Sequence, residues 1–131
     1  AFVTRVIDGD TIEVRINGRI EKVRLIGVDT PETKDPRKPV EYFGEEASAF
    51  TTSLVKGRHV ILRDDPVNQN GARYHRLLRY VFLEDGTLVN AEIIRQGYGF
   101  AYTKYPFSLM EEFRELQQEA REEGRGLWAE E

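Results

Sequence analysis

Hydrophobic and polar residues alternate along the first part of the chain, which is typical of half-buried strands. Ile12, Val14 and Ile16 are apolar, the residues between them are polar, and Asn17-Gly18 follows at once. Because Asn-Gly suits the positive φ angles of a tight turn, this segment predicts an antiparallel hairpin. We expect strands at 3–7, 11–16 and 21–28, and two more at 59–63 and 77–83.

A longer period predicts three helices. Between 39 and 57 the apolar residues recur at spacings of three and four, on one helix face: Val40, Phe43, Ala47, Phe50 and Leu54. A short helix is predicted at 90–96. The last helix is predicted to begin at Ser108, which forms a capping-box pattern with Glu111, and to end at Gly124, with Trp128 packing back on the fold.

These elements predict an α+β fold, a five-stranded OB-like antiparallel β-barrel with three flanking α-helices. A length of 131 residues with 40% hydrophobic content suits one domain over 1–131. No segment approaches the roughly 20 apolar residues of a membrane span, and the first residues lack the layout of a signal peptide. We expect a soluble monomer whose leader, if it has one, is absent from this chain.

The composition narrows the chemistry. The chain has no cysteine and two histidines, which excludes disulfides, thiolate zinc sites, cysteine nucleophiles and multi-histidine metal sites. A bound metal therefore needs oxygen ligands, which favours calcium or magnesium. The net charge of −4 speaks against a nucleic-acid partner, but acidic residues concentrate in 111–131 and basic ones at 34–38 and 73–79. That distribution is compatible with binding a polyanion locally.

Two short segments beside predicted strands are rich in oxygen ligands, namely Asp8-Gly9-Asp10-Thr11 and Asp29-Thr30-Pro31-Glu32. Each alone is an ordinary turn sequence. Arg24 interrupts an apolar strand, so its side chain points either to solvent or into a polar site, and Arg76 has the same ambiguity. Two arginines, a hard cation and a carboxylate together would make a phosphodiesterase site.

Several segments agree at once with one family. They are Val-Ile-Asp-Gly-Asp-Thr-Ile at 6–12, Val-Arg-Leu-Ile-Gly-Val-Asp-Thr-Pro-Glu-Thr at 23–33, Gly-Glu-Glu-Ala-Ser-Ala-Phe at 44–50, Leu-Val-Asn at 88–90, Arg-Gln-Gly at 95–97 and Leu-Trp at 127–128. In order and spacing the chain resembles the staphylococcal nuclease, or thermonuclease, family over essentially its whole length.

The resemblance implies a calcium-dependent endo/exonuclease that hydrolyses DNA and RNA, preferably unpaired, with little sequence specificity. Water attacks phosphorus and the 5′ oxygen departs, leaving 3′-phosphates. The resemblance places Ca²⁺ on the carboxylates of Asp10 and Asp29 and on the carbonyl of Thr30. It makes Arg24 and Arg76 a phosphate clamp and Glu32 the general base. It assigns substrate contacts to Lys38, Arg73, Tyr74 and Tyr102, and it suggests an extracellular or cell-envelope location; Asp8 is read as a turn residue.

One stretch departs from the family pattern. The family reads Asp-x-Tyr-Gly-Arg where this chain has Ala72-Arg73-Tyr74-His75-Arg76. If the glycine position needs a positive φ, His75 is strained or the loop takes another path, which bears on the placement of Arg76. Two other functions stay open: a non-catalytic nucleic-acid or protein-binding module, and a structural domain with a calcium-stabilised loop. The role of Tyr105 is also open.

Overall fold

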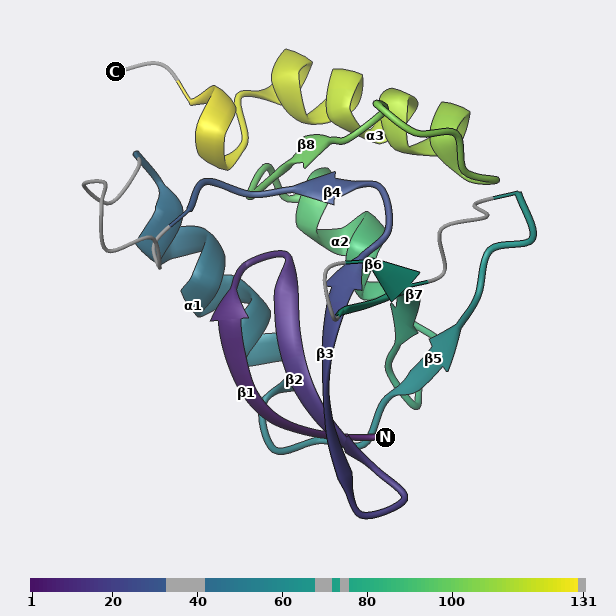
Figure 1. The fold of residues 1–131 in the computed structure, drawn as a ribbon. Helices are drawn as coiled ribbons and strands as arrows, with labels where there is room; N and C mark the ends of the chain where they lie inside the picture. Colours follow the sequence, from purple (N-terminus) through teal and green to yellow (C-terminus); the bar gives the residue numbers. More distant parts are fainter. Residues whose placement is uncertain (33–41, 68–71, 74–75, 130–131) are drawn as a thin grey trace.

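A computed structural model describes residues 1–32, 42–67, 72–73 and 76–129 (Figure 1). Its elements are β1 (Phe2–Asp8), β2 (Thr11–Ile16), β3 (Arg19–Leu25), β4 (Val28–Asp29), α1 (Gly44–Val55), β5 (Ile61–Arg63), β6 (Ala72–Arg73), β7 (Arg76–Phe82), α2 (Val89–Arg95), β8 (Phe100–Ala101), α3 (Met110–Glu123) and the 3₁₀ helix η1 (Gly126–Trp128). All three predicted helices are confirmed, and β2 has the predicted bounds.

The N-terminal strands form the predicted antiparallel meander. β1 pairs with β2, and β2 pairs with β3 across a turn in which Asn17 has φ 50° and Gly18 has φ 78°. Ile12 and Val14 are fully buried, whereas Arg15 between Val14 and the turn is exposed. The alternation therefore identified the core face of this sheet correctly.

The strand order corrects the predicted closed antiparallel barrel. The main path is β1-β2-β3-β7-β5, with β6 on β7, and β3 pairs with β7 in parallel. The chain reaches β7 after α1 and β5, so β7 returns in the same direction as β3, which hairpin reasoning does not reveal. Among the described residues, a bridge from Phe2 to His59 and backbone hydrogen bonds between 1–3 and 57–60 join β1 to the segment before β5. The sheet is not closed as a barrel, because β1 and β5 do not pair as strands. The α+β class and the five-strand path are confirmed.

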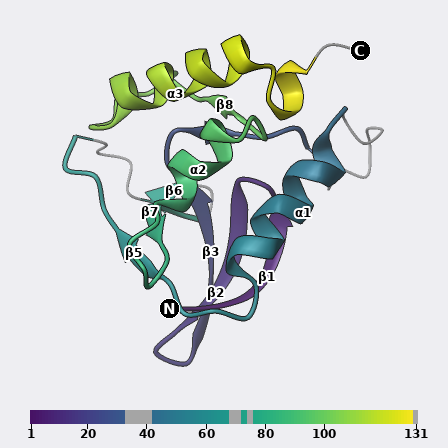
Figure 2. The same cartoon turned by 180° about the vertical axis from the view of Figure 1, so that it is seen from behind.

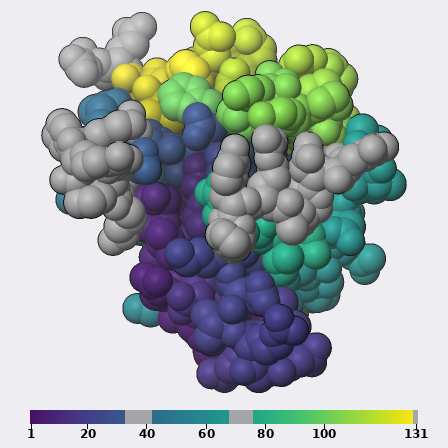
Figure 3. Space-filling model, viewed as in Figure 1, coloured from purple at the N-terminus to yellow at the C-terminus, as the bar shows by residue number. Residues whose placement is uncertain are grey.

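The helices cover the sheet on two sides. α1 runs beside β1, and α2 contacts β7, β4 and α3 (Figures 1 and 2). Buried Ile93 of α2 and Phe113 of α3 join Val23 and Leu25 of β3 in one core cluster. The space-filling view shows α3 and η1 at the top of the molecule and the N-terminal strands at the bottom (Figure 3). In the described part of the chain, no helix combines the length and apolarity of a membrane span.

The predicted capping box is wrong. α3 begins at Met110 after Leu109, and no side chain caps it. The Ser108 hydroxyl instead donates a 2.7 Å hydrogen bond to Asp65, which is only 5% exposed. Water can hydrogen-bond the free N–H groups at an exposed helix end. A buried carboxylate has no such alternative, so leaving it without donors costs more free energy. Trp128 packs back as predicted, edge-on against Phe100 at 5.4 Å between ring centroids.

Candidate functional site

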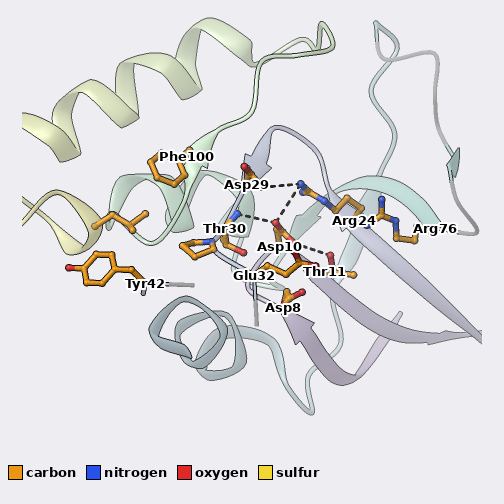
Figure 4. Close-up of a pocket in the computed structure, with 12 residues that line it drawn as sticks. Asp8, Asp10, Thr11, Arg24, Asp29, Thr30, Glu32, Tyr42, Arg76 and Phe100 are labelled. Atoms are coloured by element: carbon orange, nitrogen blue, oxygen red, sulfur yellow. Dashed lines mark hydrogen bonds and ion pairs between the residues drawn. The ribbon is translucent and has the colours of Figure 1, made fainter. Parts of the chain in front are cut away.

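A cavity of about 540 Å³ lies where the β1–β2 turn and the segment after β3 meet β7, β8 and η1 (Figure 4). Its lining combines both segments singled out in the sequence with both arginines and an apolar group: Asp8, Asp10, Thr11, Arg24, Asp29, Thr30, Pro31, Glu32, Tyr42, Arg76, Phe100 and Leu127. Residues far apart in the sequence thus meet in one concave site.

Asp10 joins the two acidic segments. Its Oδ2 accepts a 2.9 Å hydrogen bond from the backbone N–H of Thr30, and its Oδ1 accepts one of 2.9 Å from the Thr11 hydroxyl. The second segment begins at Asp29, the last residue of β4, and β4 pairs with β8, with Asp29 opposite Phe100. Asp10 is 7% exposed, so its charge lies in the floor of the cavity, while Asp29 is exposed.

Arg24 points into this polar site and not to open solvent. Its Nη2 lies 3.5 Å from Asp10 Oδ2 and 3.7 Å from Asp29 Oδ1, and its side chain is 16% exposed. Its Nη1 donates to the carbonyls of Leu25, at 3.1 Å, and Val28. The guanidinium is therefore fixed from two sides, because two carboxylates and two carbonyls hold its orientation.

Arg76 lines the same cavity despite the unusual sequence before it. It is the first residue of β7 and pairs with Lys22 of β3, two residues before Arg24 on the neighbouring strand. Side chains alternate along a strand, so Arg76 and Arg24 share one face of the sheet. The Arg76 Nε is buried and has no hydrogen-bond partner among the described residues. The backbone of His75 lies outside those residues.

The charges of the described lining residues do not balance. Among them are four carboxylates, those of Asp8, Asp10, Asp29 and Glu32, and two guanidinium groups, which gives a formal charge of −2 for this part of the lining. No group of three or more acidic, histidine or cysteine side chains forms a metal-binding cluster within the described residues. The donor set of two carboxylates with neighbouring carbonyls nevertheless fits a hard divalent cation, because calcium completes its coordination with backbone oxygens and water.

The remaining predicted contacts fall in different places. Tyr102 lies outside the cavity lining, and the centre of its ring is 5.7 Å from the Arg24 guanidinium. The Tyr105 ring lies edge-on to the Tyr102 ring, with 6.5 Å between the ring centroids. Lys38 and Tyr74 lie outside the described residues, and Arg73 is described by its backbone alone.

The sequence reasoning missed an apolar wall of the cavity formed by Tyr42, Phe100 and Leu127. These residues come from three separate segments, with no shared periodicity. Exposure distinguishes the two aromatic residues, because Tyr42 is 65% and Phe100 37% exposed, in contrast to the buried core aromatics. Leu127 is half-buried.

Comparison with known proteins agrees with this geometry. A family model described as Staphylococcal nuclease homologue matches residues 22–130. The chain is 38% identical over 128 residues to a thermonuclease of Staphylococcus hyicus, covering 97% of this chain and 74% of the relative. It is 36% identical over 127 residues to the SPbeta prophage-derived endonuclease YokF of Bacillus subtilis, covering 95% and 42%. It is 33% identical over 145 residues to an uncharacterised protein of Methanocaldococcus jannaschii, covering 96% and 70%. The chain therefore belongs to the staphylococcal nuclease family.

Proposed function

We propose that this chain is a calcium-dependent nuclease that hydrolyses phosphodiester bonds of DNA and RNA with little sequence specificity. The observation that carries the proposal is a cavity lined by Arg24, which Asp10 and Asp29 hold, and by Arg76. The described residues of its lining have a formal charge of −2. A phosphodiester would meet two guanidinium donors there, but only after a divalent cation has balanced the carboxylates. Relatives named thermonuclease and endonuclease support the same activity.

The two arginines suit a phosphoryl group whose negative charge grows during the reaction. Arg24 is already oriented by the carbonyls of Leu25 and Val28, so little reorganisation accompanies its binding to phosphate oxygens. The guanidinium group of Arg76, which lines the same cavity, supplies further donors. Contacts that strengthen towards the transition state accelerate the reaction, whereas equal binding of substrate and transition state does not.

Glu32 is the proposed general base. It is exposed and lines the cavity, where water can reach it. Its carboxylate takes the proton of the attacking water as the oxygen of that water bonds to phosphorus. The bond from phosphorus to the 5′ oxygen then breaks, and this oxygen takes a proton from solvent. The products carry a 3′-phosphate and a 5′-hydroxyl, and no 2′-hydroxyl takes part, so both sugars are accepted.

The carboxylates of Asp10 and Asp29 and the carbonyl of Thr30 would hold the calcium ion. When bound, the ion polarises a phosphoryl oxygen as a Lewis acid. Asp10 is positioned for this by the backbone of Thr30 and the hydroxyl of Thr11, which fix both of its oxygens.

A cleavage assay separates this proposal from a non-catalytic module that binds nucleic acid or protein. End-labelled single-stranded DNA and RNA are incubated with Ca²⁺ or with a calcium chelator, and product ends are tested with a 3′-phosphatase. We expect calcium-dependent cleavage to 3′-phosphates. Glu32→Gln should lower kcat by about 10²- to 10⁴-fold, whereas Glu45→Gln, on the exposed face of α1, should not. Binding without cleavage would favour the module.

A structural domain with a calcium-stabilised loop would neither cleave nor bind DNA or RNA in this assay.

We further propose that residues 1–131 act as one monomeric nuclease domain, outside the cell or in its envelope. Size-exclusion chromatography tests the monomer, and fractionation of the source cells tests the location.

A further inference from the structure

We propose that the apolar wall of Tyr42, Phe100 and Leu127 is a base-binding surface, which stacks on the nucleobase next to the cleaved phosphate. This inference rests on the proposed nuclease function and adds a substrate contact to it. It concerns a surface separate from Tyr102, which lies beside Arg24 outside the cavity lining.

Phe100 stands directly beside the acidic part of the site. It pairs with Asp29 in the antiparallel ladder of β4 and β8. Directly opposite residues in such a ladder project from the same face, with Cβ atoms about 5 Å apart. Phe100 is nevertheless 37% exposed. An apolar ring is thus held in the open next to a carboxylate proposed to bind the metal, close to where the reacting phosphate must lie.

Tyr42 is held in place by a row of aromatic rings. Its ring centroid lies 5.8 Å from that of Phe43, which stacks at 5.4 Å on Tyr98, which in turn stacks at 4.2 Å on Phe50 of α1. Phe43 has φ 67°, an uncommon conformation for a bulky residue. Tyr42 therefore adjoins a packed aromatic row on one side, and the residue is 65% exposed at the cavity.

The other side of the wall is supported as well. Trp128 contacts Phe100 edge-on, and the backbone N–H of Leu127 donates a 2.7 Å hydrogen bond to the carbonyl of Gly97. The wall is therefore built before a ligand arrives, which reduces the ordering cost of binding.

The cavity separates its apolar side chains from its cationic ones. Figure 4 shows Tyr42 and Phe100 on one side, Arg24 and Arg76 on the other, and the carboxylates between them. Guanidinium groups bind a phosphate, and aromatic faces stack on a base of any sequence. In a duplex both faces of an internal base are covered by its neighbours, so only an unpaired or splayed base can reach the wall.

The test uses single-stranded octamers with one cleavable phosphodiester among methylphosphonate linkages. The nucleotide on either side of that phosphodiester carries its base or is abasic. Phe100→Ala and Tyr42→Ala should each raise KM about 10-fold for the substrate with both bases, the range of one lost base stack. One of the two abasic octamers lacks the base that stacks on the wall. On that octamer, the KM of both variants should match the KM of the wild type within about twofold. A fully paired duplex should be cut slowly by wild type and variants alike.

Controls separate stacking from structure. Phe100→Trp keeps an aromatic face and should restore KM, and Val67→Ala removes an exposed apolar side chain outside the cavity lining and should change nothing. Equal losses on base-containing and abasic octamers would show that Phe100 and Tyr42 act through packing, and would overturn the inference. The absence of any loss would overturn it too.

A binding experiment distinguishes failure of the nuclease proposal from failure of the base-binding inference. If the wild type cuts no octamer with calcium, the same octamers carrying a dye are titrated by fluorescence anisotropy. Binding that needs the base and is weakened by Tyr42→Ala supports the base site without catalysis. Binding independent of the base, or no binding, overturns the inference.

Discussion

Replacing Asp65 by asparagine removes the charge from a buried network that joins β7 to the start of α3. The carboxylate accepts four hydrogen bonds, from the Tyr80 hydroxyl, the Val67 N–H at 2.7 Å, and the N–H and hydroxyl of Ser108, both at 2.7 Å. An asparagine offers one oxygen, and its NH₂ group must face donors. Because a buried unpaired donor costs about 1–3 kcal/mol, the amide cannot replace the carboxylate.

The magnitude follows from the pKa of Asp65. Burial alone raises this pKa, but the hydrogen bonds from Tyr80, Ser108 and Val67 outweigh burial and lower it from 3.8 to about 2. The folded pKa is below the unfolded one, so the charge stabilises the fold above pH 4, by about 2.5 kcal/mol. About half of this contribution is lost by pH 3, and most of it by pH 2.

Urea unfolding at pH 7, 4, 3 and 2, followed by the fluorescence of the single tryptophan, measures the effect. We expect Asp65→Asn to lower the free energy of unfolding at pH 7 by about 3 kcal/mol or more. The difference between wild type and variant should shrink by about 2 kcal/mol towards pH 2. Asp85→Asn, which alters an exposed turn, is the matched control. A difference that stays constant with pH would refute the assigned role of the Asp65 charge.

Three further predictions concern separate parts of the molecule. Asn90→Ala should destabilise the fold by about 3 kcal/mol in urea unfolding, because the side chain bonds the Val81 N–H and the Ile26 carbonyl, both at 2.9 Å; a loss below about 1 kcal/mol would contradict this. Gly97→Ala should cost at least about 2 kcal/mol more than Gly86→Ala in the same assay, since both have positive φ but only a Cβ at 97 would meet backbone, 2.2 Å from the Arg125 carbonyl. Arg76→Ala should lower kcat about 100-fold without changing the calcium concentration for half-activation, and a negligible effect would remove Arg76 from the mechanism.

Local patterns predicted those parts of the fold that depend on which face of an element is buried. The alternation through Ile12 and Val14 and the spacing in α1 and α3 correctly placed these elements. Long-range pairing is different, because nothing within β3 or β7 specifies that they run parallel. The two-residue strands β4, β6 and β8 are too short to have a period. Ser108 shows how a tertiary contact, here with Asp65, overrides a local cap.

Residue type singled out the polar half of the candidate site as one of several readings, and the resemblance to the nuclease family then assigned roles to its residues. Carboxylates beside strand ends identified Asp10 and Asp29, and the cost of burying a charge identified Arg24, although its direction needed the structure. The apolar wall had no such signal, because an exposed Tyr42 and a buried tyrosine look the same in a sequence. Because exposure is a property of the assembled fold, the apolar wall could not be predicted from the sequence.

Gly9 and Gly99, which lie against Thr30, allow the two acidic segments of the candidate site to come together. The Asp8-Gly9-Asp10 sequence is an ordinary turn pattern, yet neither Gly9 nor Gly99 has a positive φ. Added Cβ atoms at these positions would lie 2.9 Å and 3.0 Å from the Thr30 side chain. Neither position has room for a side chain. The absence of a Cβ at both lets Thr30 approach closely enough for its N–H to donate a hydrogen bond to Asp10. The geometry of the two acidic segments thus depends on missing side chains, a feature that a search for carboxylates overlooks.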